Sequence, residues 1–204
     1  MQRSIVRFVA IPVASAGVLA GAAFAAPAAS AATAASAATA ATGTDTAGSV
    51  THVESLSALT GLEADGITTS TNPSSDESID QASNTVSFTF PVSGGNGDAS
   101  TQTGSVDMSG SGTFASSKGS LTLTNLTLNL KNGTYGGVDA SGTQVVLQVH
   151  DTQSQVSGTS QSYDAGELTM TASAAATFNQ ALGTTIFAAG EDLGSLTASW
   201  TFTS

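Results

Sequence analysis

Alternation of apolar and polar side chains is the feature that most constrains the fold of this 204-residue chain. Between Val86 and Val92 every second residue is Val or Phe, and the residues between them are Ser, Thr and Pro. This period of two is typical of a strand that buries one face, because successive side chains of a strand point to opposite sides of the sheet. The same period returns at 145–149 and 196–202, so the sequence predicts a sheet protein.

A change of phase within one leucine run refines this expectation. Leu121 and Leu123 share one parity, whereas the leucines from Leu126 to Leu130 share the other. One extra residue in a strand turns all later side chains to the opposite face. We therefore expect either a β-bulge at Asn125 or the end of one strand there.

One segment has a helical period instead. From Ala174 to Leu182 the apolar residues recur every four positions, Thr171 or Ser173 can cap the start, and Gly183 follows in the position of a C-terminal cap. The leucines between 56 and 62 could form a second short helix. Residues 68–84 and 151–164 are polar, and we expect loops there.

Short strands separated by Gly and Asn turns, with one short helix near the C-terminus, predict a mainly β fold. The expected architecture is an antiparallel β-sandwich or an open barrel. It forms a single domain over residues 50–204. A domain of roughly 155 residues buries about 70% of the surface of its unfolded chain, which is enough to fold without disulfides.

The first 31 residues fit a secretory signal peptide. Arg3 and Arg7 precede an apolar run that ends at Ala25, and small residues up to Ala31 offer cleavage sites. The run is too short and too diluted by Gly and Ser to match a membrane span of about 20 apolar residues. Residues 32–49 are mostly Ala and Thr, and we expect them to form a disordered stalk.

The charge balance limits the partners. Fifteen acidic residues face four basic ones, for a net charge of −11, whereas nucleic acids and anionic membranes are bound through clustered Lys and Arg. The absence of cysteine excludes disulfides and thiolate metal sites. We expect no nucleic-acid partner, no transmembrane segment after signal cleavage, and a product that is secreted, either extracellular or loosely associated with the cell envelope.

Catalytic candidates are few. A Ser-His-Asp triad would need His150 as its base, and no G-x-S-x-G motif accompanies it. A glycosidase would need two carboxylates across a cleft. The candidates are Asp76-Glu77, Asp164 with Glu167, and Glu191-Asp192. All of these carboxylates lie in polar segments, where we expect them to be exposed to solvent. The D-x-D-x-D-G spacing of a calcium loop does not occur. We expect no catalytic residue, no metal site and no enzyme.

Haem is the cofactor to consider, because a phenolate or an imidazole can ligate its iron. The candidate ligands are Tyr135 in a glycine-rich turn, Tyr163 in a polar segment, and His150 at the end of a strand. In the main interpretation the protein has no cofactor, and these residues matter only if haem binds.

The chain resembles the HtaA-type domains of exported actinobacterial envelope proteins, several of which are associated with haem uptake. The resemblance covers about residues 86–202 in family order. It is carried by Phe90–Gly95, by Gly104–Phe114, by Lys118–Leu126, and by the closing stretch Leu168–Ala172, Phe178-Asn179, Gly183, Phe187, Gly190 and Leu193-Gly194.

The resemblance implies an exported β-rich fold with a late short helix. It also implies where haem ligands would lie. Haem-binding members have a tyrosine in an aromatic and basic N-terminal segment, whereas residues 50–84 here contain no Tyr, Trp, Phe, Lys or Arg. They also carry a histidine just before the strand that begins near Leu121, and Ser116-Ser117-Lys118 stands there instead.

The main functional interpretation is an exported, non-catalytic β-sandwich module with a binding or structural role at the envelope. Its partner would be an unknown envelope component or a small ligand, and self-association through a strand edge near Phe88–Val92 is a further expectation. The first alternative is a haem-binding or haem-uptake protein. The second is a secreted carbohydrate-active hydrolase.

Overall fold

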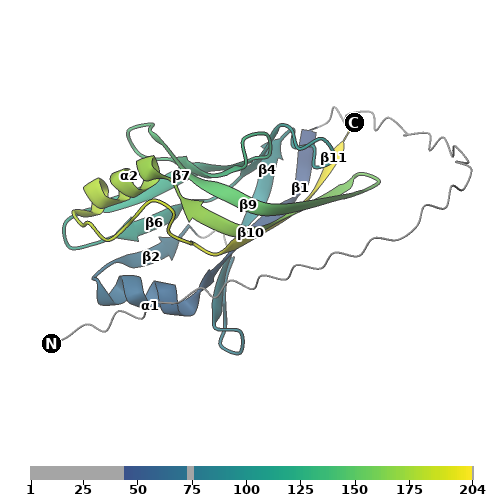
Figure 1. Ribbon diagram of the computed structural model, residues 1–204. Coiled ribbons are helices and arrows are strands. Elements are labelled where there is room, and N and C mark those ends of the chain that lie inside the picture. The colour runs from purple at the N-terminus through teal and green to yellow at the C-terminus, as the bar shows by residue number, and fades with distance from the viewer. Residues whose placement is uncertain (1–43, 73–75, 204) are drawn as a thin grey trace, which may run out of the picture. The chain divides into compact units, whose positions relative to one another are not determined.

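The computed structural model describes residues 44–72 and 76–203 (Figure 1). The expected signal peptide, residues 1–31, and most of the expected stalk lie outside these residues. In chain order the elements are β1 (Thr44–Ser55), α1 (Leu56–Ala64), β2 (Thr68–Thr71), β3 (Asp76–Asp80), β4 (Thr85–Gly95), β5 (Ser105–Met108), β6 (Gly112–Ala115), β7 (Ser120–Asn129), β8 (Thr134–Val138), β9 (Gln144–Ser157), β10 (Ser160–Met170), α2 (Ala172–Leu182) and β11 (Ser195–Thr203).

Eight of these strands form a closed antiparallel barrel. The neighbours around the ring are β1, β4, β5, β7, β8, β9, β10 and β11, and β11 pairs again with β1. Outside the ring, β3 pairs with the first half of β4, and the pair β2–β6 extends from the first half of β7. The expected mainly β fold is confirmed, and the pairing of β7 with β8 closes the sheet.

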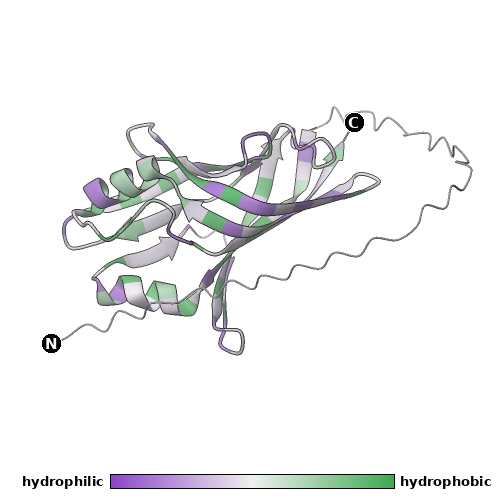
Figure 2. Ribbon diagram, in the orientation of Figure 1, coloured by the Kyte–Doolittle hydropathy of each residue, from purple (hydrophilic) through white to green (hydrophobic). Residues whose placement is uncertain are grey.

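The alternating segments form the barrel strands, as predicted. In β4 the apolar residues from Val86 to Val92 are buried, and the residues between them are exposed or half-buried. Figure 2 shows this alternation of apolar and polar residues along the barrel strands. β1 begins at Thr44, inside the segment expected to be a stalk. Its small residues Ala47 and Gly48 pair with β11 through the backbone, which needs no bulky side chain.

The phase change in the leucine run is a β-bulge, one of the two options expected. β7 continues through it, its register with β8 shifts between Thr124 and Thr127, and Asn125 has a φ of 50°. Leu121 and Leu128 are both buried although they differ in parity. The bulge therefore lets a single strand belong to the β2–β6 extension at its start and to the barrel at its end.

The late helix is α2, and its caps match the sequence. The Thr171 hydroxyl accepts a hydrogen bond from the amide of Ala174 at 3.1 Å, and Gly183 ends the helix with a φ of 60°. The Lys118 ammonium donates to the Gly183 carbonyl at 2.8 Å, which places a positive charge at the negative end of the helix dipole. The short leucine helix is also present, as α1, with Ser55 as its N-cap.

Two loop expectations were wrong. Residues 151–164 form the outer half of a hairpin, in which β9 runs to Ser157, β10 starts at Ser160, and Gly158 turns between them with a φ of 61°. Residues 68–84 include β2 and β3. Most side chains of these segments lie outside the core, so apolar and polar residues do not alternate along them. These strands form through backbone pairing, and the sequence pattern therefore does not reveal them.

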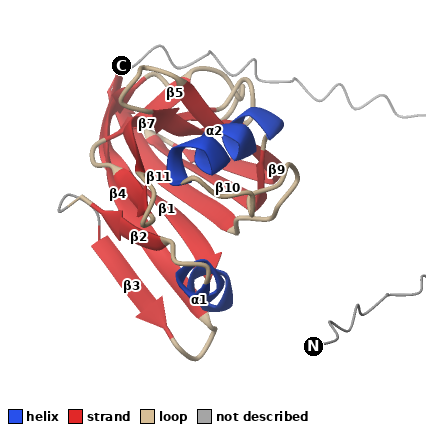
Figure 3. Cartoon of the chain, turned by 90° about the vertical axis from the view of Figure 1, so that its left-hand side faces the viewer, coloured by secondary structure: helices blue, strands red, loops and turns tan. Residues whose placement is uncertain are grey.

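Both helices lie at one end of the barrel, together with β2 and β6 (Figure 1), and this end faces the viewer in Figure 3. We call this the helix end. Within residues 44–72 and 76–203, no helix is long and apolar enough to span a membrane.

A candidate ligand cavity at the helix end

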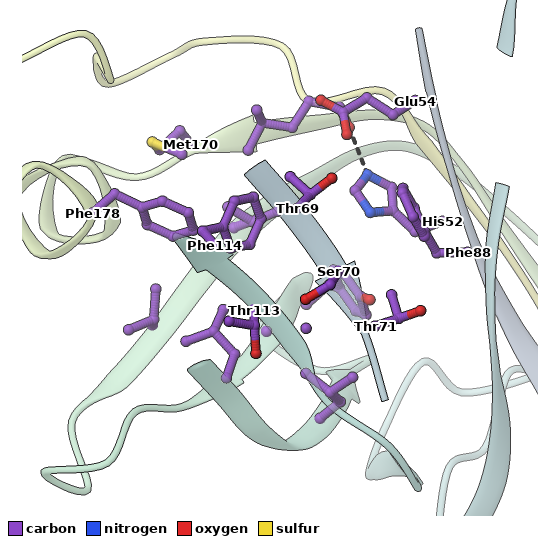
Figure 4. A pocket seen from close by; sticks show the side chains of 18 of the residues that line it. His52, Glu54, Thr69, Ser70, Thr71, Phe88, Thr113, Phe114, Met170 and Phe178 are labelled. Carbon is purple, nitrogen blue, oxygen red and sulfur yellow. Dashed lines mark hydrogen bonds between the residues drawn. The ribbon is translucent and has the colours of Figure 1, made fainter. Parts of the chain in front are cut away.

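A cavity of about 110 Å³ lies inside the helix end of the barrel. Its walls come from β1, β2, β4 and β6 to β10, from both helices, and from the segment 183–194 that joins α2 to β11 (Figure 4). Almost all of the lining is apolar and includes Leu59 and Leu62 of α1 and Phe114 of β6. The cavity is therefore a site for an apolar body, with few polar groups to orient it.

Three phenylalanines pack as a row along one wall. The ring centroids of Phe114 and Phe178 are 4.8 Å apart in an edge-to-face arrangement, and those of Phe178 and Phe187 are 5.0 Å apart. Asn179 fixes Phe187 through two hydrogen bonds to its backbone, one to the carbonyl at 2.8 Å and one from the amide at 3.1 Å. The segment 183–194 is thereby held against α2.

His52 is a polar group of this cavity, and it points inward from β1. Its Nε2 lies 2.6 Å from the carbonyl oxygen of Leu193. Because a carbonyl only accepts, Nε2 carries the proton and Nδ1 of the neutral ring is unprotonated. Burial lowers the pKa of His52, and the hydrogen bond to Leu193 opposes that shift only partly. The ring is therefore uncharged near neutral pH.

Tyr135 of β8 faces His52, with their ring centroids 5.8 Å apart. Burial raises the pKa of Tyr135 well above its usual range, so the phenol stays protonated. Among the described residues, no hydrogen bond reaches its hydroxyl. Tyr135 thus offers the cavity a neutral donor that no protein group uses.

Glu54 is the acidic group of the lining, two residues beyond His52 on the same face of β1, and the hydroxyl residues Thr69, Ser70, Thr71 and Thr113 also line the cavity. It is only 8% exposed, and burial raises the pKa of its carboxyl to about 7, with further upward effects from Glu191 and Asp192. No hydrogen bond or ion pair to its carboxylate is present in the described part of the chain. A buried carboxylate without a partner is costly, so this group is unusual.

The residues expected as ligands do not gather at one place. Tyr135 lines the cavity, whereas Tyr163 is buried elsewhere in the barrel and His150 lies exposed on β9 with its Nε2 2.8 Å from the Thr169 hydroxyl. His52 and Glu54 were not among the expected ligands. Their parity could have identified them, because both lie on the face of β1 that begins with buried Val50.

None of the expected carboxylate pairs lines the cavity, but Glu191 and Asp192 lie near enough to Glu54 to raise the pKa of its carboxyl. Asp76 and Glu77 are exposed on β3, and Asp164 is exposed on β10. In the described residues, no group of three or more His, Cys, Asp or Glu side chains is placed to hold a metal ion. A single carboxylate, Glu54, lines the cavity.

The opposite end of the barrel is built differently. Residues 96–104, between β4 and β5, cross to β10 and β11, and we call this the loop end. Trp200 donates its indole N–H to the Gly97 carbonyl at 3.1 Å, and a carboxylate oxygen of Asp45 accepts the Gly97 amide at 2.9 Å. Ala99 is fully buried and its amide donates to the side-chain carbonyl of Gln161. These contacts close the loop end.

Comparisons with known proteins give a likeness in structure. No protein-family model matches the chain, and no curated protein does. The crystal structure of the C-terminal domain of HtaA from Corynebacterium glutamicum covers 78% of this chain and 100% of that chain, with a TM-score of 0.50 and 17% identity. The heme binding protein HtaB from the same organism covers 78% of this chain and 95% of its own, with a TM-score of 0.51 and 11% identity.

The domain has the HtaA-type fold. The likeness agrees with the resemblance read from residues 86–202, and it covers a larger share of the chain than those residues. In this HtaA-type domain the helix end holds a cavity, and the loop end is sealed by Trp200 and Asp45.

Proposed function

We propose that this HtaA-type domain is a non-catalytic binding module whose helix-end cavity takes a compact, largely apolar ligand. The apolar cavity of about 110 Å³ carries the proposal. An engineered cavity of about 150 Å³ lined by Leu, Ile and Phe binds benzene, so a cavity of this size suits a ligand of similar dimensions. Polar side chains at its wall would orient that ligand, among them His52, Glu54 and Tyr135 and the hydroxyls of Thr69, Ser70, Thr71 and Thr113.

Haem is the second candidate. Likeness to the heme binding protein HtaB favours it over a purely structural role. Tyr135 and His52 supply side chains of a suitable kind, because tyrosine and histidine both ligate haem iron in some proteins. Among the described residues, no protein group binds the Tyr135 hydroxyl, and only Nε2 of His52 is used, by the Leu193 carbonyl.

The remaining features of the cavity do not fit haem. Sites for drug-sized ligands measure about 300–1,000 Å³, well above the volume here. No Lys or Arg lines the cavity to pair with the two anionic propionates of haem, and the Glu54 carboxyl lies there instead. Burial also holds the phenol of Tyr135 in its neutral form. We therefore derive no role for haem in the main proposal.

The main proposal is tested by filling the cavity. A side chain at Gly112 would extend into open space, because its Cβ would meet no heavy atom within 4 Å. We expect Gly112→Ile to abolish the benzene-induced rise in melting temperature of the full chain. Gly94→Ile is the matched control, since Gly94 also has open space around it and lies outside the cavity. Equal responses of both variants would refute the cavity as the site.

Haem is tested separately by titrating haemin into the full chain. We expect no shift of the Soret band beyond that of free haemin. A shifted band that is lost in Tyr135→Phe and kept in Tyr163→Phe would show that haem is the ligand. That result would overturn the proposal of a compact, largely apolar ligand.

We also propose that the module is exported and remains free or loosely attached to the envelope, as the signal sequence supports. The support lies in the charged start and the apolar run of residues 1–31. Mass spectrometry of the protein recovered from the medium should find a chain that begins near residue 32. Size-exclusion chromatography of that protein tests for self-association. The edge expected near Phe88–Val92 is not free for it, because β4 pairs with β1 on one side and with β3 and β5 on the other.

A further inference from the structure

The strongest unexplained feature of the cavity is the Glu54 carboxylate. Glu54 is only 8% exposed, and it lines the cavity. Its carboxylate has no hydrogen bond and no ion pair among the described residues. Buried charges in proteins are almost always paired, because an unpaired one loses its hydration without compensation. The partner of Glu54 is therefore to be sought in the ligand.

The charges around Glu54 specify the sign of that partner. Glu191 and Asp192 act on Glu54 from the segment 183–194 and add negative potential at this rim. His52 and Tyr135 contribute no charge, since burial keeps the imidazole unprotonated and the phenol protonated. The lining contains no Lys or Arg. A cation is attracted to this rim, and a carboxylate is repelled.

The body of the cavity specifies the rest of the ligand. Phe88, Phe90 and Phe114 line it, and aromatic faces attract a cation as well as apolar groups. A volume of about 110 Å³ suits a ligand of about the size of benzene.

We infer that the cavity selects a compact amine, whose protonated nitrogen pairs with the Glu54 carboxylate while its hydrocarbon part packs among the phenylalanines. The inference rests on the proposed binding function and names its ligand class. Glu54 is then the specificity-determining residue. The raised pKa of its carboxyl agrees with this role, because the missing partner is the group that would return that pKa to its usual range.

Three probes that share one hydrocarbon test the inference. They are 3-methylbutylamine, 3-methylbutan-1-ol and 3-methylbutanoate, and the first two have as many non-hydrogen atoms as benzene. Each is titrated into the full chain at pH 8, with methyl NMR signals of the cavity residues as the readout. A hydrogen bond to a charged group contributes about 1.5–3 kcal/mol, so we expect the amine to bind at least about tenfold more tightly than the alcohol. The carboxylate should bind most weakly.

Charge-neutralising variants identify the responsible group. Glu54→Gln should bring the affinity ratio of amine to alcohol close to one while the alcohol still binds. Glu77→Gln removes the same charge from an exposed site on β3 and should leave the ratio unchanged.

The outcomes separate the two proposals. If the alcohol binds as tightly as the amine, or if Glu54→Gln keeps the preference for the amine, the inference is overturned and the binding function stands. If none of the three probes binds, the proposed function itself fails.

Discussion

The two ends of the barrel treat buried polar groups in opposite ways. β1 runs the length of the barrel and supplies a carboxylate to each end, Asp45 at the loop end and Glu54 at the helix end. Asp45 meets the Gly97 amide, whereas Glu54 meets no protein donor in the described part of the chain. Asp45, which accepts a hydrogen bond from a backbone amide, stabilises the fold. Glu54, which faces the cavity, is available to a ligand.

The loop end also keeps some unsatisfied atoms. One oxygen each of Asp45 and Asp98 and the amide nitrogen of Gln161 are buried without a hydrogen-bond partner among the described residues. Each of these side chains uses its other polar atom in a hydrogen bond, as Asp98 does with the Ser100 hydroxyl at 2.6 Å. Both ends therefore hold polar groups without a protein partner among the described residues, and at the helix end such a group, Glu54, lines the cavity.

The largest expected effect compares aromatic truncations at the two ends. Trp200→Ala should lower the free energy of unfolding by about 4 kcal/mol, because it removes a fully buried ring and leaves the Gly97 carbonyl without its donor. Phe114→Ala at the helix end should cost about 2 kcal/mol, since that ring is only half-buried against Phe178. Urea denaturation measures both. A greater loss for Phe114→Ala would reverse the roles assigned to the two ends.

The next effect concerns the pH dependence of stability. The pKa of Glu54 is about 7 in the folded protein and 4.5 as the ordinary value, so the folded state binds more protons between these pH values. Stability due to this group is highest below pH 4.5 and is lost as the pH rises to 7. Glu54→Gln should therefore stabilise the protein by up to about 3 kcal/mol at pH 8 and have little effect at pH 4.

His52 serves as an internal check on that experiment. Its pKa is lowered on folding, so it has the opposite sign and reduces stability as the pH falls below 6.5. His52 is present in both wild type and Glu54→Gln, so its contribution to the free energy of unfolding cancels when the two stabilities are subtracted. A difference between wild type and variant that does not change from pH 4 to pH 8 would mean that Glu54 is already paired.

Much of the barrel could be predicted from the sequence because its strands each bury one face. The alternation around Phe88 and the phase change at Asn125 gave two strands and a bulge that the structure confirms. Closure of the sheet could not be predicted, because it depends on β1 pairing with both β4 and β11, and β11 lies at the far end of the chain, where no local turn signals the pairing.

The site was predicted from the sequence only in part. Tyr135 was a candidate because a phenolate can ligate haem iron, whereas His52 and Glu54 were obscured by their place next to the expected stalk. Sequence alone does not show that β1 is a strand of the barrel wall, which follows from its pairing with β4 and β11 on either side. The alternation Val50, His52, Glu54 is the signal that would have placed both groups inside.

The smallest effect tests whether the helix end unfolds together with the barrel. Gly61 lies exposed on α1, and a Cβ there would meet no atom within 4 Å. Alanine is favoured over glycine inside a helix by about 0.5–1 kcal/mol, so Gly61→Ala should raise the free energy of unfolding by that amount. The gain appears in urea denaturation only if α1 belongs to the same cooperative unit as the barrel. Should amide exchange slow in α1 alone while the global stability is unchanged, the cavity wall formed by Leu59 and Leu62 opens independently, and ligand entry would use that motion.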